Sequence, residues 1–328
     1  TLPGEWLNLS GPGRLANDLH PDNNSLGSTR VFEAVPHLVN KPILEGGLVN
    51  SALGALFSYY VQGEMSRDCA GFPTRMQPTT FNPEHGTDHL ELFNVKHFIA
   101  RWQRTRAALR DSPRWRALAT ADKWELFELI SHRGDDVFIP PHAPVGVVTR
   151  RWKDAALEWI YTHDLLPYPF VLAANASELP AGIPTMQERD YFRLAADLRT
   201  GAQPPPALPR LSASGSDAID VLEHDTHRIR FRTRAVGRPH IVKVTHFPNW
   251  RVRGAEGPFR VTPCFLLIYP REAEVTLYYG SVLSDHAGRA VTILGIILVI
   301  GSIATRLTVG RTERRRPLKT ASRGGPRR

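Results

Sequence analysis

Cysteine is scarce in this chain, which has only Cys69 and Cys264 among 328 residues. Two cysteines cannot build the multi-bridge framework that stabilises small secreted domains, so a disulfide scaffold is excluded. One bridge between them is compatible with an extracytoplasmic chain. The alternative is that Cys264, which lies in an apolar stretch, is a small core residue.

Net charge is almost absent from residues 1 to 305. Nine of the 41 basic residues and one of the 32 acidic residues lie between Arg306 and Arg328, which leaves 32 basic and 31 acidic residues for the rest. The alkaline pI of about 9.9 therefore belongs to the C-terminal tail. A folded part without a basic excess gives no support for nucleic-acid binding, and we expect no nucleic-acid partner.

One long uncharged run is present, from Ala290 to Thr305 (AVTILGIILVIGSIAT), between two arginines. As a helix it spans about 24 Å, and continuation to Gly310 gives about 31 Å, close to the roughly 30 Å hydrocarbon core of a bilayer. Its nine Val, Ile and Leu residues together contribute about −4 kcal/mol to insertion. We predict a transmembrane helix over 287–310; the alternatives are a buried core helix and, less compatible with a basic end, a lipid-anchor signal.

The basic tail, residues 311–328, sets the predicted orientation. Short basic flanks stay in the cytoplasm, so residues 1–289 are expected outside a plasma membrane and the tail inside, where it can touch anionic lipid. An exported N-terminal region needs an upstream export element. We therefore expect either the C-terminal part of a longer membrane protein or a chain with a trimmed signal peptide.

The outer region is predicted to be α+β. Residues 1–30, rich in Gly, Pro, Asn and Ser, predict an irregular entry segment, and residues 31–173 alternate helical and strand patterns typical of a mixed α/β domain. Residues 174–216 predict a connector, with a short helix over Gln187–Leu198 and a Pro-rich linker.

Residues 217–286 predict a small β-sandwich-like domain. Strict alternation in HRIRFRTR (227–234) places Ile229, Phe231 and Thr233 on one face and the arginines on the other. Three more runs predict strands: HIVKVTHF (240–247), FRVTPCFLLIYP (259–270) and EVTLYYG (274–280).

Several of these segments together resemble a known family. They are RVFEAVPHLVNKPILEGGLVNSALGALFSYYVQGEMS (30–66), LELFNVKHFI (90–99), WELFEL (124–129), FPNW (247–250), TPCFLLIYP (262–270) and VTLYYG (275–280), followed by the last helix. The pattern of apolar and turn residues over about 30 to 310 resembles the C-terminal half of bacterial and archaeal membrane proteins labelled 6-pyruvoyl-tetrahydropterin-synthase-related. These multi-span proteins are similar to the YfhO-like family and to GT-C glycosyltransferases.

The resemblance implies the extracytoplasmic C-terminal region of a GT-C-like membrane glycosyltransferase that uses a polyprenyl-phosphate sugar. The implied partners are the bilayer, upstream transmembrane helices, that donor and a glycan acceptor. The implied catalytic acids lie upstream, so we expect no catalytic residue, cofactor or metal within this chain; a divalent metal is compatible with a full-length protein. The alternative is a non-catalytic, membrane-anchored glycan-binding or assembly module of the cell envelope.

Seven residues are candidates for ligand contact. Glu45, Tyr59, Tyr60 and Gln62 either line a groove or serve local capping and packing. Trp250 is either part of a sugar-stacking platform or a core or membrane-interface aromatic. Arg230 and Arg232 either bind phosphate or an anionic glycan, or are neutralised by Asp217, Asp220, Glu223 and Asp225 across strands.

Two acidic tracts allow a cation site. His85, Asp88, His89 and Glu91 have spacing that permits a divalent metal on one helix face, but the tract follows Asn-Pro and fits a loop or helix start better. Asp135 and Asp136 offer too few oxygen ligands alone and fit a turn paired with Arg133.

Overall fold

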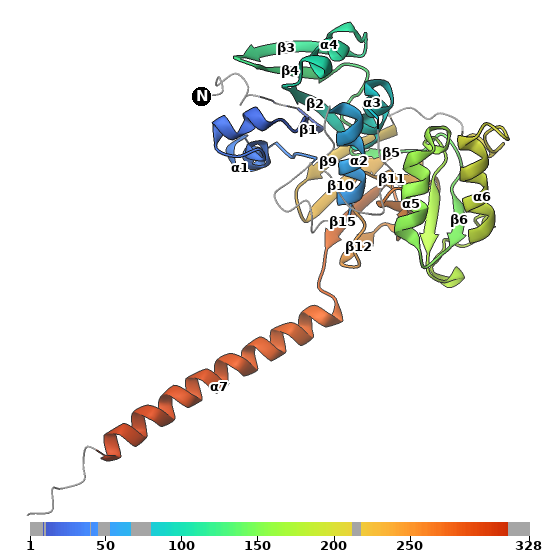
Figure 1. The fold of residues 1–328 in the computed structure, drawn as a ribbon. Helices are drawn as coiled ribbons and strands as arrows, with labels where there is room; N and C mark the ends of the chain where they lie inside the picture. The colour runs from blue at the N-terminus through green and yellow to red at the C-terminus, as the bar shows by residue number, and fades with distance from the viewer. Residues whose placement is uncertain are drawn as a thin grey trace, which may run out of the picture. The chain divides into compact units, whose positions relative to one another are not determined.

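The computed structural model describes residues 9, 11–39, 41–44, 53–66, 80–211 and 218–313, with side chains as far as residue 304. The chain divides into two compact units, Thr1–Tyr279 and Gly280–Arg328. The first is a mixed α+β body with three sheets (Figure 1), which confirms the α+β part of the predicted fold. The second contains the long C-terminal helix.

The first sheet has the strand order β1-β2-β4-β3. Its strands are β1 (Arg14–Asn17), β2 (Val95–Ala100), β3 (Trp115–Ala121) and β4 (Trp124–Leu129). β1 runs parallel to β2, whereas the β2–β4 and β3–β4 pairs are antiparallel. Helices α2 (Ala55–Met65), α3 (Pro83–Leu92) and α4 (Gln103–Asp111) belong to the same part of the body, and α3 and α4 both contact β2.

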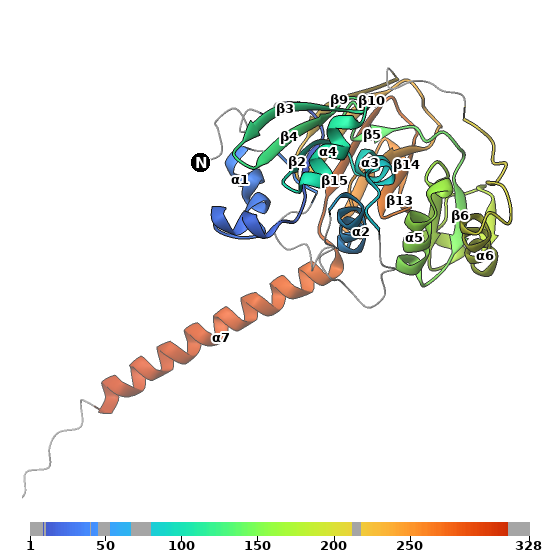
Figure 2. The same cartoon turned by 45° about the horizontal axis from the view of Figure 1, so that its top comes forward.

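The second sheet has seven strands in the order β5-β11-β14-β13-β7-β6-β8. They are β5 (Val137–Phe138), β6 (Val145–Val148), β7 (Phe170–Ala173), β8 (Thr185–Gln187), β11 (His240–Val242), β13 (Ala255–Val261) and β14 (Phe265–Pro270). Helices α5 (Trp152–Tyr161) and α6 (Glu188–Arg199) accompany β6–β8 (Figure 2). Strands from the regions predicted as two domains, 31–173 and 217–286, thus share one sheet.

The third sheet is antiparallel, with the order β12-β15-β10-β9. Its strands are β9 (Ile219–His224), β10 (Arg228–Thr233), β12 (Trp250–Arg253) and β15 (Glu274–Tyr279). Ile229, Phe231 and Thr233 are buried, as the alternation predicts. Ile229 and Phe231 form one core with Val242, Leu266 and Ile268 of the seven-stranded sheet, so the two sheets pack on each other.

The expected single strand over 259–270 is wrong. The structure has two antiparallel strands there, β13 and β14, whose pairing includes Val261 with Phe265. Pro263 lies between them, and a proline has no N–H to continue a strand ladder. The remaining short elements are α1 (Val35–Val39) and the 3-10 turns Pro21–Leu26, Val31–Ala34, His163–Leu165 and Ala176–Glu178.

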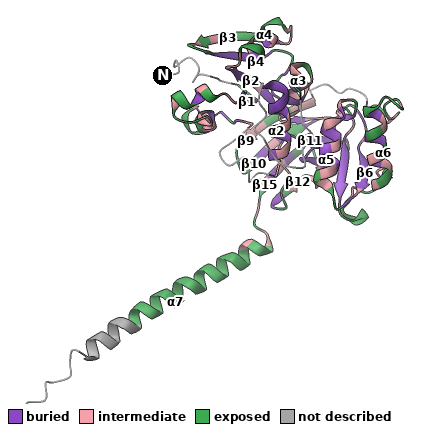
Figure 3. Cartoon of the chain, in the orientation of Figure 1, coloured by how far each residue is buried: buried purple, intermediate pink, exposed green. Residues whose placement is uncertain are grey.

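Helix α7 (Leu283–Glu313) contains one segment, Leu283–Ala304, that is long and apolar enough to cross a membrane. Its large apolar side chains are exposed on all sides (Figure 3). This finding rests on length and composition and agrees with the sequence expectation for 287–310.

Gly254, between β12 and β13, gives a stability test of the body. Its φ is +76°, and a Cβ there would collide with the carbonyl oxygen of Glu274. Gly237 has a similar φ of +79° and open space around it. We expect Gly237→Ala to cost about 1–2 kcal/mol for the left-handed backbone, and Gly254→Ala a further 1–3 kcal/mol, roughly, for overpacking. Urea unfolding of both variants measures this, and equal losses would contradict it.

Candidate functional site

Helix α3 positions the acidic side chains of the candidate site. Asn82 caps the helix, accepting a hydrogen bond from the backbone N–H of His85 at 3.2 Å, and Pro83 occupies its first turn. The 85–89 tract is therefore a helix start, one of the two structures expected for it. Asp88 and Glu91 are three residues apart and lie on one face of the helix.

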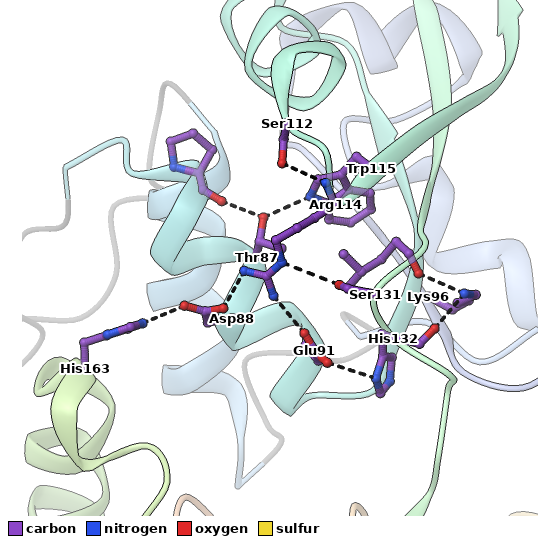
Figure 4. Close-up of polar contacts among 12 residues, drawn as sticks. Thr87, Asp88, Glu91, Lys96, Ser112, Arg114, Trp115, Ser131, His132 and His163 are labelled. Atoms are coloured by element: carbon purple, nitrogen blue, oxygen red, sulfur yellow. Dashed lines mark hydrogen bonds and ion pairs between the residues drawn. The ribbon is translucent and has the colours of Figure 1, made fainter.

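Arg114, just before β3, connects these two carboxylates (Figure 4). Its guanidinium donates to Asp88 Oδ1 at 2.6 Å and to Glu91 Oε2 at 2.7 Å. The base of the cluster is fixed by Thr87, which accepts from Trp115 Nε1 at 2.9 Å and donates to the Pro83 carbonyl. The two acids are thus held in place by the first sheet.

Two histidines from other segments complete the cluster (Figure 4). His163 Nε2 donates to Asp88 Oδ2 at 2.7 Å. His132 is buried, with Nδ1 lying 3.7 Å from Glu91 Oε1 and Nε2 donating to Asn94 Oδ1 at 2.7 Å. Asp88 and Glu91 therefore each contact Arg114 and one histidine.

A cavity of about 760 Å³ opens beside this cluster. Its polar lining comes from Asp88, Glu91, His132, Asp135, His163, Asp164 and Lys243. An apolar wall includes Leu92, Phe138, Leu166 and Tyr168. The volume lies within the range of small-molecule sites, which combine apolar walls with a few placed polar groups.

Burial and pairing shift the pKa values of the lining groups. Burial opposes ionisation of Asp88, but hydrogen bonds from His163 and Arg114 outweigh it and lower its pKa to about 2. The hydrogen bond to Asp88 raises the pKa of His163 above its usual value. Burial lowers the pKa of Lys243 to about 8, although Glu91 and both neighbouring aspartates oppose that change. The cavity thus holds a carboxylate with a pKa of about 2 and a lysine with a pKa of about 8.

The His163–Asp88 pair predicts a pH-dependent stability. Because the folded-state pKa of His163 is raised, its contribution is complete below about pH 6.5 and is lost as pH rises through the folded pKa. We expect the free energy of unfolding of wild type to exceed that of His163→Gln by up to about 1 kcal/mol at pH 5.5, and this gap to narrow as the pH rises through the folded-state pKa of His163. Urea midpoints across this range measure it. The same series in an Asp88→Asn background should show no gap, and a constant gap would contradict the assignment.

The predicted residues of the α2 region lie apart from the cavity lining. Tyr59 and Gln62 are buried, and the half-buried Tyr60 packs 4.7 Å from the Tyr161 ring and 5.8 Å from the His89 ring. Glu64, on the same helix, is buried against His89. Glu45 falls outside the described residues. These contacts agree with packing, and the ligand role of the four candidates stays a prediction.

Trp250, Arg230 and Arg232 lie in the third sheet. Trp250 is in the core and packs edge-on against Tyr279, with ring centroids 5.5 Å apart. Arg230 lies 3.7 Å from both Glu223 and Glu274, and Arg232 lies 3.4 Å from Glu274. Neutralisation across strands is therefore present, with Glu223 as expected and Glu274 as a partner that the sequence analysis missed. Ligand contact by these residues stays a prediction.

The cation and disulfide alternatives have different outcomes. Asp136 accepts from Asn94 Nδ2 at 2.5 Å and from His224 Nδ1 at 2.6 Å. Within the part of the chain that the structure describes, no three His, Cys, Asp or Glu residues are arranged to hold a metal ion.

Cys264 is buried, and burial raises the pKa of its thiol to about 12. Cys69 falls outside the described residues, so the bridge stays a prediction.

Sequence reasoning singled out Asp88, Glu91 and Asp135 but missed His132, His163 and Lys243. His163 lies 75 positions from Asp88, and Lys243 lies 152 positions from Glu91, whose carbonyl oxygen it contacts. No local motif marks such pairs. A lysine inside the apolar run HIVKVTHF was the available signal, because lysine is almost never fully buried without a partner.

Comparison of the chain with models of protein families finds no match, and neither do comparisons with curated proteins and with solved structures.

Proposed function

We propose that the body is an extracytoplasmic domain anchored to a plasma membrane by α7. The observation that carries this proposal is the exposure of its apolar side chains: Val291, Ile293 and Leu294 are 56–70% exposed, and the residues that follow are similar. Burying one such side chain contributes about 1.5–3 kcal/mol, so a helix apolar on all sides requires a cover. A bilayer supplies it over the whole segment.

The basic tail supports the orientation within this proposal. Arg306 and the eight further basic residues up to Arg328 follow the apolar segment directly. Such residues stay on the cytoplasmic side, so the body lies outside. The tail lies where it can contact anionic lipid headgroups.

We further infer a role on the acceptor side of a GT-C-like glycosyltransferase that uses a polyprenyl-phosphate sugar. The support is the resemblance, whose segments 247–250, 262–270 and 275–280 fall in β12, β14 and β15 and the turns around them. In this proposal the catalytic acids and further transmembrane helices are supplied upstream. The second candidate is a membrane-anchored glycan-binding or assembly module. The cavity beside α3 favours it, because a cavity can bind a ligand without catalytic residues.

Cysteine labelling tests the anchoring and the orientation. Asp122, in the β3–β4 turn, is exposed, and Ser322 lies in the basic tail. In a background without the native cysteines, Asp122→Cys should react with a membrane-impermeant maleimide on intact cells. Ser322→Cys should react only after permeabilisation. The reverse pattern, or labelling of a chain that washes off the membrane, would overturn the proposal.

Sugar transfer separates the two functional candidates. Membranes that carry the chain with its native upstream region should transfer a labelled sugar from a polyprenyl-phosphate donor, and deletion of the body should abolish transfer. If glycan binding persists in membranes that show no transfer, the module is the better description.

A further inference from the structure

The cavity beside α3 contains a buried cation with unused hydrogen-bonding capacity. Lys243 is 5% exposed and lines this cavity. Its ammonium donates to the Glu91 carbonyl at 3.0 Å, which is the single hydrogen bond that it makes within the described residues. An ammonium has three N–H donors, and a buried donor that has no hydrogen-bond partner costs free energy. The lysine therefore has donors available for an oxygen atom placed in the cavity.

The charges around the cavity oppose an anionic occupant. Four lining carboxylates, those of Asp88, Glu91, Asp135 and Asp164, face one lining lysine. Arg114 and His163 offset part of this charge, but the ion pairs of Arg114 are with Asp88 and Glu91 and that of His163 is with Asp88. Neither forms an ion pair with the other two acids. A phosphate in the cavity would lie beside these carboxylates, and two like charges 4 Å apart near a protein surface repel by about 4 kcal/mol. The electrostatics favour a ligand without negative charge.

The reachable carboxylates and the apolar wall of the cavity suit a hydroxylated ring. Carboxylates accept hydrogen bonds only, and Asp164 is exposed while Asp135 is half-buried, so both remain reachable for hydroxyl donors. The same cavity is lined by Phe138 and Leu166, which offer apolar surface for the C–H face of such a ring. The Lys243 ammonium lies 5.2 Å from the centroid of the Phe138 ring, which places the donor beside that apolar wall.

We propose that this cavity binds an uncharged carbohydrate. Lys243 donates to a hydroxyl, ring or carbonyl oxygen of the sugar, Asp135 and Asp164 accept from its hydroxyls, and the wall containing Phe138 packs on its apolar face. Binding follows from the cavity alone. Its assignment as the acceptor, rather than the anionic polyprenyl-phosphate donor, rests on the proposed function.

The test uses the full chain in phosphatidylcholine nanodiscs, because sugar-based detergents would compete. The probes are four neutral trisaccharides, built from glucose, mannose, galactose or N-acetylglucosamine, and inorganic pyrophosphate as the anionic arm. Saturation-transfer NMR and calorimetry should show saturable binding of at least one trisaccharide. Pyrophosphate should neither bind nor displace it.

Variants locate the binding. Asp135→Asn combined with Asp164→Asn should weaken trisaccharide binding about tenfold, and Lys243→Met should weaken it at least as much. Asp122→Asn, which removes an exposed carboxylate outside the cavity, should leave it unchanged. If the double variant or Lys243→Met has a lower melting temperature than wild type, Asp164→Asn alone serves as the test. Asp164 is exposed, so its replacement should not affect folding, and it should weaken trisaccharide binding about threefold.

Three outcomes would overturn the inference. Absence of binding by all four trisaccharides refutes the carbohydrate site, as does binding that Asp164→Asn and the double variant leave intact. Displacement by pyrophosphate refutes the uncharged ligand class. If trisaccharides bind but the labelling test reverses the topology, the cavity assignment stands and only the acceptor role is lost.

Discussion

Replacing Ile293 and Ile297 by arginine is expected to release the chain from the membrane. Arginine at the centre of an inserting helix costs about 2.5–3.5 kcal/mol, so two cost roughly 6 kcal/mol. Seven of the nine Val, Ile and Leu residues of this segment remain in the variant and contribute about −3 kcal/mol, which is too little to offset the two charges. Wild type should resist carbonate extraction from membranes, whereas Ile293→Arg/Ile297→Arg should appear in the extract.

A conservative pair of substitutions controls for local effects on the helix. Ile293→Leu/Ile297→Leu keeps the apolar character and should remain with the membrane. Both positions are more than half exposed in α7, so neither change disturbs the core of the body. If the arginine variant stayed resistant to carbonate, another surface of the chain would have to hold it, and the anchoring role of α7 would be refuted.

The elements that sequence analysis predicted well are those with a short period or a single-segment signal. The alternation in β10 indicated which side chains are buried because successive strand residues point to opposite faces. The apolar run of α7 was equally visible, since its signal needs no partner. The hairpin at Pro263 was missed because the apolar pattern continues through it, and the proline should have ended the predicted strand.

Neither the sheet order nor the candidate site could be predicted in this way. The seven-stranded sheet joins β5 to β11 and β7 to β13, pairs separated by many elements along the chain. The cavity likewise combines residues of α3, residues 132–138, residues 163–168 and Lys243. Each segment alone offers an ordinary histidine, aspartate or lysine. These residues form a polar site only when the fold brings them together, and the local periodicity of the sequence carries no information about such long-range contacts.

The buried Glu64–His89 pair should produce the largest loss of stability in the body. His89 Nδ1 lies 2.7 Å from Glu64 Oε2, and the two side chains are 1% and 4% exposed. His89→Leu leaves the carboxylate buried without this partner, which costs about 3–5 kcal/mol. At roughly 2–4 °C per kcal/mol, the melting temperature should fall by about 10 °C. Thermal melting of the nanodisc-bound chain, followed by tryptophan fluorescence, measures the shift.

A double variant separates the loss of the pair from the loss of packing. Glu64→Met/His89→Leu replaces both partners with apolar side chains, and such replacements are often neutral or stabilising, so most of the loss should be recovered. His85→Leu makes the same change one turn earlier, at a half-buried residue stacked on His163 at 4.1 Å, and should cost little. If the double variant were as unstable as His89→Leu, the loss would come from packing between α2 and α3, where Gly86 meets Met65, and not from the unpaired charge.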